Sequence, residues 1–262
     1  MDHAIMWMLT GLIAGFLDYT FAVGFGLIAS LILVLSTGAD PRTVAGTAAL
    51  AQVLLALVAT GYHNRSGNID PSVRSRARLL SLFAAATIAG GLATSIAVAG
   101  VKRHYIELIY PFSLILLALF IIYDGVSNNR EGWHGGPNGR LLVIGTGLLS
   151  GAYKALIGGG YSVLVVLLQK RIGVDLRSGI ALAPLLKAPS FLLIGVTYLL
   201  AGFVQLENLA ALTIGALASL PLSAATLGRL GHSRNIELVT AAILLAAGLL
   251  KLALQSTIIT QP

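Results

Sequence analysis

The sequence predicts an all-α polytopic membrane protein made of two inverted repeats, each a broken or re-entrant helix hairpin followed by three transmembrane helices. Three observations lead to this prediction. Of the 262 residues, 56% are hydrophobic and only 10% are charged, whereas soluble domains carry about 25% charged residues. The apolar residues fall into segments long enough to cross a bilayer, which takes about 20 residues per helix. Finally, the second half of the chain repeats the motifs of the first.

The composition also excludes several classes of protein. The formal net charge of +7 comes from 17 basic residues, but these are spread through short connecting segments, where Lys and Arg set membrane orientation. Nucleic acid is therefore not an expected partner. The chain has no cysteine, which excludes disulfides and thiolate catalysis. No two histidines share a helical face at metal-ligand spacing, so we expect no metal and no cofactor.

Eight apolar segments are separated by charged or Gly/Pro-marked breaks. Six have ordinary lengths for a single membrane crossing. The other two are too long for one straight helix and are interrupted by glycine, which indicates that each is a pair of half-helices. The long segments are Ile5–Ser36 and Leu141–Leu168, and the ordinary ones are Thr43–Tyr62, Leu79–Ala99, Tyr105–Tyr123, Ser178–Ala201, Leu209–Leu227 and Ile236–Leu254. The N-terminus lacks a signal-peptide pattern, so the first segment is expected to remain in the mature protein.

The two long segments begin the two copies of the repeat. Gly11–Gly15 (GLIAG) corresponds to Gly147–Gly151 (GLLSG), and the loop Gly38–Arg42 (GADPR) corresponds to Gly173–Arg177 (GVDLR). We interpret the glycines spaced four apart as helix-packing positions. A polar, Gly-rich stretch joins the copies. The expected division is a first membrane repeat at 1–127, a linker at 128–139 and a second membrane repeat at 140–262.

The placement of Lys and Arg bears on whether the long segments cross the membrane or enter and return. If all eight segments cross, seven basic residues lie on one side and eight on the other, which gives no orientation. If both long segments are re-entrant hairpins, eleven lie on one side and four on the other, a clear positive-inside bias. We therefore favour hairpins. Each copy then has three crossings, so the copies are inverted, and both termini of this multi-pass cell-membrane protein lie outside the cytoplasm.

Three charged residues are predicted to lie inside the membrane, where each costs about 2.5–3.5 kcal/mol. Asp18 precedes the first glycine break, Lys154 occupies the corresponding place in the second copy, and Lys187 lies near the midplane. One interpretation is a structural Asp18–Lys154 ion pair. Lys187 is expected to lack a carboxylate partner in any membrane segment. A buried ammonium group without such a partner either loses its proton or binds an anion. We therefore predict an anion site, with Gln52, the counterpart of Lys187, as a hydrogen-bond donor.

The glycine breaks are expected to add further anion-binding groups. A helix that starts at a glycine presents free backbone N–H groups with no Cβ to hinder a ligand; the alternative is close helix packing. The expected binding residues are Gly24 and Gly26 in the first copy and Gly158, Gly159, Gly160 and Ser162 in the second. Pro184 and Pro189 flank Lys187 and can break its helix, either as a packing kink or as a hinge for gating.

This order of motifs resembles the TauE/SafE sulfite exporter family, in which a glycine-spaced helix, a Gly-rich break, an apolar half-helix, a short loop and a second helix occur twice. Tyr62–Asp70 (YHNRSGNID) is similar to the family's connection after its second helix, and Tyr198–Val204 (YLLAGFV) is similar to the counterpart in the second copy. The resemblance covers nearly the whole chain. It implies transport of sulfite, organosulfonates or related sulfur-containing anions across the cytoplasmic membrane.

The predicted function is secondary transport, with export as the expected direction, of a small sulfur-containing anion held at the midplane by Lys154 and Lys187. Asp18 is expected to couple transport to protons: when protonated it releases Lys154 for the anion, and when ionised it competes for that lysine. The alternatives are an anion channel, or a permease for a different small oxyanion or carboxylate. The chain has no GxSxG or HExxH motif, so it is not expected to be an enzyme. Eight segments are compatible with a monomer or a homodimer.

Overall fold

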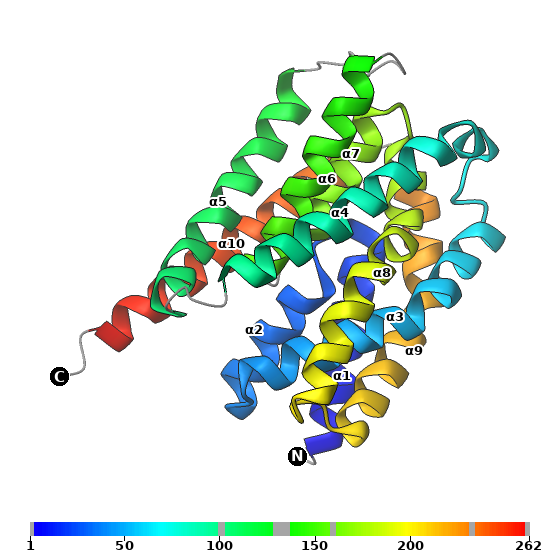
Figure 1. Cartoon of the computed structure of the whole chain (residues 1–262). Helices are drawn as coiled ribbons and strands as arrows, with labels where there is room; N and C mark the ends of the chain where they lie inside the picture. The colour runs from blue at the N-terminus through cyan, green and yellow to red at the C-terminus, as the bar shows by residue number, and fades with distance from the viewer. Residues whose placement is uncertain (1–2, 99–102, 128–136, 158–160, 231–233, 260–262) are drawn as a thin grey trace.

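The computed structural model describes residues 3–98, 103–127, 137–157, 161–230 and 234–259, and these residues form helices and no strand (Figure 1). This confirms the all-helical fold. The first half of the chain holds α1 (His3–Phe21), α2 (Phe25–Thr37), α3 (Pro41–Arg65), the 3-10 helix η1 (Pro71–Arg76), α4 (Ala77–Val98) and α5 (Arg103–Ser127). The second half holds α6 (Pro137–Ile157), α7 (Tyr161–Arg171), α8 (Leu176–Leu200), α9 (Leu206–Leu230) and α10 (Arg234–Ile259).

Within the described residues, six helical spans are long and apolar enough to cross a membrane. They are His3–Phe21, Pro41–Arg65, Pro71–Thr94, Leu176–Leu200, Leu206–Leu230 and Asn235–Ala253. Shorter apolar helical stretches occur at Phe25–Thr37 and Pro111–Asp124. Large exposed leucines cover the outer faces of these helices, as expected where lipid replaces water. The chain is therefore a polytopic α-helical membrane protein.

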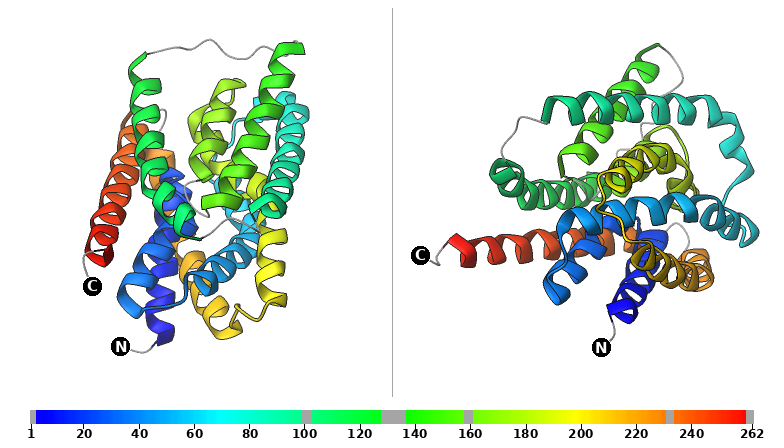
Figure 2. Two further views of the ribbon diagram at one scale, coloured as in Figure 1. Left: turned by 60° about the vertical axis from the view of Figure 1, so that its left-hand side comes forward. Right: turned by 60° about the horizontal axis from the view of Figure 1, so that its bottom comes forward.

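The first long segment is broken, as predicted. Helix α1 ends at Phe21 and α2 begins at Phe25, and two residues between them have positive φ, Ala22 at 56° and Gly24 at 112°. Figures 1 and 2 show α2 running back toward the end of the bundle where α1 begins. That direction supports a re-entrant hairpin, whose position in the membrane stays a prediction. In the second half, residues 158–160 separate α6 from α7 and lie outside the described residues.

The two predicted matching loops have the same local structure. Gly38 and Gly173 both have left-handed φ, at 66° and 82°. Asp40 then caps α3 by accepting a hydrogen bond from the backbone N–H of Arg42 at 2.8 Å. Asp175 caps α8 in the same way, with the N–H of Ser178 at 3.1 Å. Each loop thus ends one half-helix and starts the long helix that follows.

The direction of the two halves can be followed in the ribbon. Figures 1 and 2 place the start of α1 and the end of α10 toward one end of the bundle, and the end of α5 and the start of α6 at the opposite end. This placement supports the prediction that the copies are inverted. Helix α6 already begins at Pro137, inside the predicted linker. The division into repeats at 1–127 and 140–262 stays a prediction.

The halves interlock rather than pack side by side. Helix α1 packs against α9 of the second half, α6 packs against α4 of the first, and the long helices α3 and α8 cross at the centre. These contacts are close because glycines line them. A Cβ at Gly11 would overlap the carbonyl oxygen of Leu212, and one at Gly151 would overlap that of Thr87. The packing role predicted for these glycines is therefore confirmed.

Candidate functional site

Lys187 lies near the middle of α8 and points into the protein. Helix α8 begins after the Asp175 cap and places Ala183 on the same buried face as Lys187. The Lys187 side chain is only 2% exposed. Its Nζ donates hydrogen bonds to Oδ2 of Asp18 at 2.8 Å and to Oγ of Ser162 at 2.6 Å.

The expectation that Lys187 lacks a carboxylate partner is therefore wrong. Helix α1 approaches α8, and the long lysine side chain spans the space between them. Its partner is Asp18, the residue that one interpretation of the sequence assigned to Lys154. Because Asp18 and Lys187 come from different halves of the chain, the ion pair also joins the two halves.

Asp18 closes the break between α1 and α2. It lies in the last turn of α1 and is 3% exposed. Its Oδ1 accepts a hydrogen bond from the backbone N–H of Gly24 at 2.9 Å. The φ of Gly24, 112°, is one that residues with a Cβ rarely adopt. The carboxylate therefore occupies the start of α2, where the partial positive charge of a helix favours an anion and where the sequence predicted a bound ligand.

Lys154 and Lys187 approach the same aromatic ring. Lys154 lies in the last turn of α6 and is 9% exposed. Its Nζ lies 4.5 Å from the centroid of the Phe191 ring, and the Nζ of Lys187 lies 5.9 Å from that centroid. An aromatic face attracts cations, so the ring stabilises positive charge here. We name the residues Asp18, Lys154, Ser162, Lys187 and Phe191 the midplane cluster, after the depth that the sequence predicts for Lys187.

Phe191 was missed in the sequence. It follows Lys187 by one helical turn, so its ring lies on the same face of α8 as the lysine. That spacing was the signal that could have identified it. The two predicted lysines, Lys154 and Lys187, do lie together with Asp18 and Ser162 in the structure.

The remaining predicted site residues are placed as follows. Gln52 is buried, but its Nε2 donates to the carbonyl of Ala48 in its own helix at 3.3 Å, so it does not bond to the midplane cluster. Gly26 lies in the first turn of α2. Gly158, Gly159 and Gly160 lie outside the described residues. The binding roles predicted for all of these residues stay predictions.

Pro184 and Pro189 lie inside α8, which is helical from Leu176 to Leu200. The expectation that these prolines break the helix is wrong, because the helix continues through both. A proline removes one backbone hydrogen bond and clashes with the preceding turn, which the packing of α8 between neighbouring helices evidently offsets. Their role as a hinge stays a prediction.

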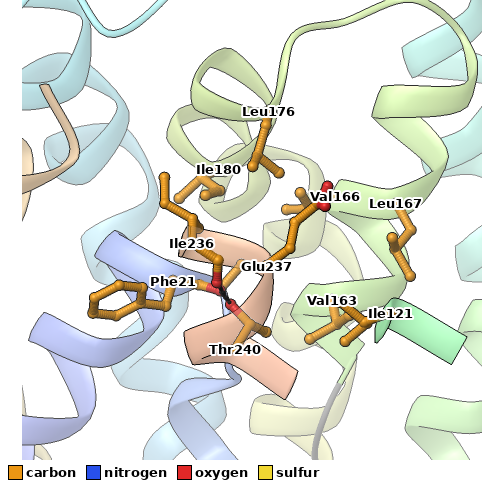
Figure 3. Close-up of a pocket in the computed structure, with 11 residues that line it drawn as sticks. Phe21, Ile121, Val163, Val166, Leu167, Leu176, Ile180, Ile236, Glu237 and Thr240 are labelled. Carbon is orange, nitrogen blue, oxygen red and sulfur yellow. Dashed lines mark hydrogen bonds between the residues drawn. The ribbon is translucent and has the colours of Figure 1, made fainter. Parts of the chain in front are cut away.

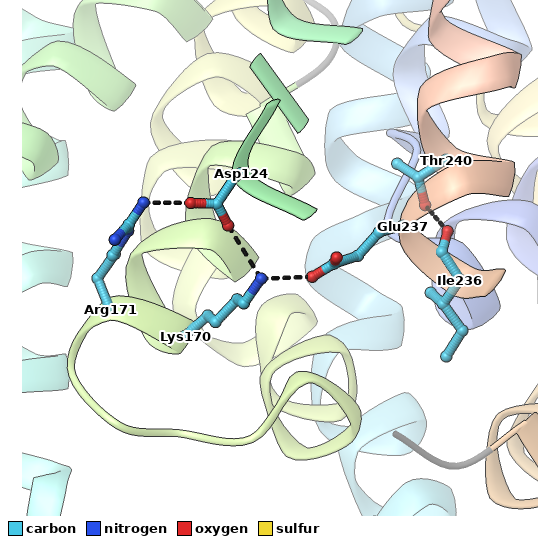
Figure 4. Close-up of polar contacts among 6 residues, drawn as sticks. All are labelled: Asp124, Lys170, Arg171, Ile236, Glu237 and Thr240. Atoms are coloured by element: carbon cyan, nitrogen blue, oxygen red, sulfur yellow. Dashed lines mark hydrogen bonds and ion pairs between the residues drawn. The ribbon is translucent and has the colours of Figure 1, made fainter. Parts of the chain in front are cut away.

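A second charged cluster was not predicted and lies near the ends of α5 and α7 and the start of α10; Figure 4 shows its contacts. Lys170 donates to Oδ2 of Asp124 at 2.9 Å and to Oε1 of Glu237 at 2.7 Å, and Arg171 pairs with the other oxygen of Asp124. The cluster joins α7 to α5 and α10. Burial lowers the pKa of Lys170, but its hydrogen bonds and charge interactions with Glu237 and Asp124 outweigh that effect and raise the pKa overall. We name these four residues the end cluster.

An apolar cavity lies beside the end cluster (Figure 3). It is lined by residues of α1, α5, α7, α8 and α10, with Glu237 and Thr240 as polar members. Thr240 donates to the carbonyl oxygen of Phe21 at 2.7 Å. Helix α10 is thereby attached to the end of α1, one turn beyond Asp18. Within the described residues, no group of three His, Asp or Glu side chains is arranged to hold a metal ion.

Comparison with known proteins gives one match. The profile of the family described as "Sulfite exporter TauE/SafE" matches residues 7–250. No curated protein and no solved structure matches the chain. The family consists of multi-pass membrane transporters rather than enzymes, which agrees with the six membrane-capable helices. Because the match covers nearly the whole sequence, the chain belongs to the TauE/SafE sulfite exporter family of the cell membrane.

Proposed function

We propose that the chain exports a small sulfur-containing anion, sulfite or an organosulfonate, by binding it in the midplane cluster. The observation that carries this proposal is the approach of two buried ammonium groups, those of Lys154 and Lys187, to the single ring of Phe191. The same cluster holds one carboxylate, that of Asp18. A sulfite or sulfonate group has three oxygens, which suit two ammonium donors and the Ser162 hydroxyl together.

Proton coupling would arise from the Asp18–Lys187 pair. While Asp18 is ionised, it occupies both the ammonium group of Lys187 and the N–H of Gly24. Protonation removes the charge of Asp18, so both donors become available to an anion. The lysine released in this proposal is Lys187 rather than Lys154. Proton and anion are then bound in the same state and cross together, so an outward gradient of the anion drives the export of both.

The anion also stabilises the state that a proton alone would destabilise. An ion pair that loses one charge leaves the other charge buried without compensation, at a cost of several kcal/mol. An anion that arrives as Asp18 is protonated replaces the lost charge. This reciprocity favours simultaneous binding over binding of the proton alone.

The experiment is efflux of labelled sulfite or taurine from proteoliposomes, comparing the parent chain with Lys187→Met. We expect at least a tenfold loss of flux, since a buried charged hydrogen bond contributes about 1.5–3 kcal/mol. Lys251→Met, near the end of α10 and outside the midplane cluster, is the matched control and should transport normally. Equal flux from Lys187→Met and the parent would contradict the proposal.

A second measurement separates a carrier from an anion channel. A carrier saturates and shows counterflow of unlabelled against labelled substrate, whereas a channel gives single-channel conductance. A thermal-shift screen against sulfite, sulfate, thiosulfate, sulfoacetate and taurine then ranks the anions. A ligand at 100 times its Kd adds about 2.7 kcal/mol to the stability of the folded state.

A further inference from the structure

A groove lies between the end of α3, the 3-10 helix η1, the start of α4 and the first half of α8. Its volume is about 560 Å³, and Lys187 is not among its lining residues. Leucines form one wall, and polar groups gather where η1 meets α3. The leucines are Leu80, Leu182, Leu185 and Leu186, and the polar residues include Asn64, Asp70, Arg74 and Ser81.

The leucine wall reaches the surface of the protein at Leu185, whereas Leu80 is buried. Leu182, Leu185 and Leu186 have the spacing that puts side chains on one face of a helix, and Leu80 of α4 joins them. Leu185 is 40% exposed, so this wall is open to the surroundings of the bundle. In a membrane protein those surroundings are acyl chains. A small hydrophilic anion gains nothing from such a wall, whereas an acyl chain buries apolar surface against it.

The polar rim of the groove carries one arginine and one aspartate. Arg74 of η1 lines the groove, and in the described part of the chain no carboxylate pairs with it. Arg76 and Arg78 follow within the next four residues, with Arg76 beside Gly173. The carboxylate of Asp70, also at the rim, accepts a hydrogen bond from the N–H of Ser72 at 2.7 Å and caps η1. Arg74 is therefore the basic side chain that lines the mouth of a mostly apolar groove.

We infer that this groove binds an anionic glycerophospholipid of the cytoplasmic leaflet. The phosphate lies on Arg74, and an acyl chain lies along Leu182, Leu185 and Leu186. The arginines belong to the end of the bundle that the positive-inside rule assigns to the cytoplasm. Basic side chains at that depth attract anionic lipid headgroups, and the groove supplies the apolar surface that a free inorganic anion would not use.

Lipid in the groove would hold η1 and α4 against α8. Helix α8 carries Lys187 and Phe191, so the bound lipid supports the helix that builds much of the midplane cluster. The lipid site is nevertheless separate from the transport site, because its residues lie on a different face of α8. A defect in lipid binding can therefore be measured without any transport assay.

The test is quenching of tryptophan fluorescence by brominated lipids, with Leu185→Trp in nanodiscs. Its signal is read as the difference from the parent chain, which has two tryptophans. At equal mole fraction, brominated phosphatidylglycerol should occupy the groove about fivefold more readily than brominated phosphatidylcholine, as expected for one arginine at an anionic surface. Leu200→Trp, also on α8 and 83% exposed, is the matched control and should be quenched equally by both lipids.

Arg74→Gln in the Leu185→Trp background should abolish the preference for phosphatidylglycerol while leaving quenching by phosphatidylcholine unchanged. Equal quenching of Trp at 185 by both lipids before the Arg74 change would overturn the inference, because the groove then holds bulk lipid only. Absence of quenching by either lipid would also overturn it, since the groove would not contain an acyl chain. Far-UV circular dichroism of each variant shows whether it is folded.

Discussion

The carboxylate of Asp18 lies 2.8 Å from the ammonium group of Lys187, and the two residues belong to opposite halves of the chain. The same carboxylate accepts the N–H of Gly24 at the break between α1 and α2. One side chain therefore connects a helix break to the central helix α8. Any change in the charge of Asp18 acts on both at once, and this makes the pair the most informative target for mutation.

Asp18→Asn should remove the dependence of transport on a pH gradient. The amide cannot ionise, so Lys187 no longer has a competing carboxylate and binds the anion independently of pH. The measurement is sulfite efflux from proteoliposomes with and without an imposed pH gradient. Asp40→Asn, which changes an exposed helix cap, should keep the coupling of the parent chain. Coupling that survives in Asp18→Asn would exclude Asp18 as the proton-binding group.

Three variants separate the interaction energy of the Asp18–Lys187 ion pair from the effect of losing either side chain. Lys187→Met leaves the carboxylate of Asp18 buried and should lower the free energy of unfolding by about 3–5 kcal/mol. Asp18→Asn alone should cost less, since Lys187 keeps its bond to Ser162. Adding Asp18→Asn to Lys187→Met should recover part of the loss, because no uncompensated charge remains. Unfolding in increasing dodecyl sulfate measures all three variants, and strict additivity would mean that the pair does not interact.

Two glycines of α6 should respond in opposite ways to alanine. A Cβ at Gly151 would overlap the backbone of α4, so Gly151→Ala forces the helices apart and should cost about 1–3 kcal/mol. A Cβ at Gly145 meets no atom within 4 Å, so Gly145→Ala should stabilise the helix by about 1 kcal/mol. Apparent melting temperatures in detergent compare the two. A fall of the same size in both would show that α4 and α6 do not approach closely.

The contribution of Lys170 to the end cluster should be lost at high pH. The pKa of Lys170 is raised in the folded state, so its contribution is fully present below the ordinary lysine pKa of about 10.4. It is lost as the pH rises through the raised value. The melting temperature of the parent chain should therefore fall more steeply above about pH 10.4 than that of Lys170→Met, while the difference between the two stays constant from pH 6 to 9. A difference that disappears already near neutral pH would contradict the assignment.

Much of the fold is predictable because the repeat consists of short local motifs that recur in both halves of the sequence. The loops at Gly38 and Gly173 are matched in sequence, and the structure gives both a left-handed glycine followed by an aspartate cap. Glycines spaced four apart predicted close helix contacts, and the backbones do approach at Gly11 and Gly151. Each of these features depends on a few neighbouring residues, which is why sequence alone was sufficient.

The partners of the charged residues depended on distant contacts and could not be derived in the same way. Corresponding positions in two repeats predict a common depth, but not which side chain reaches which. Lys154 turned out to lie over Phe191, and Lys187 reached Asp18. The end cluster required α5, α7 and α10 to meet at one end of the bundle. Asp124 and Glu237 lie more than one hundred residues apart in the sequence, so no local pattern connects them.

The interlocking of α1 with α9 has a consequence for biosynthesis. Helix α1 is inserted into the membrane long before α9 is made. The glycine-lined face of α1 that later contacts α9 must therefore first be covered by lipid or by another helix. Until the last quarter of the polypeptide has been inserted, the bundle is incomplete and the face of α1 that contacts α9 lacks its partner. A truncated chain that ends before α9 should therefore be recognised and degraded by membrane quality control rather than accumulate.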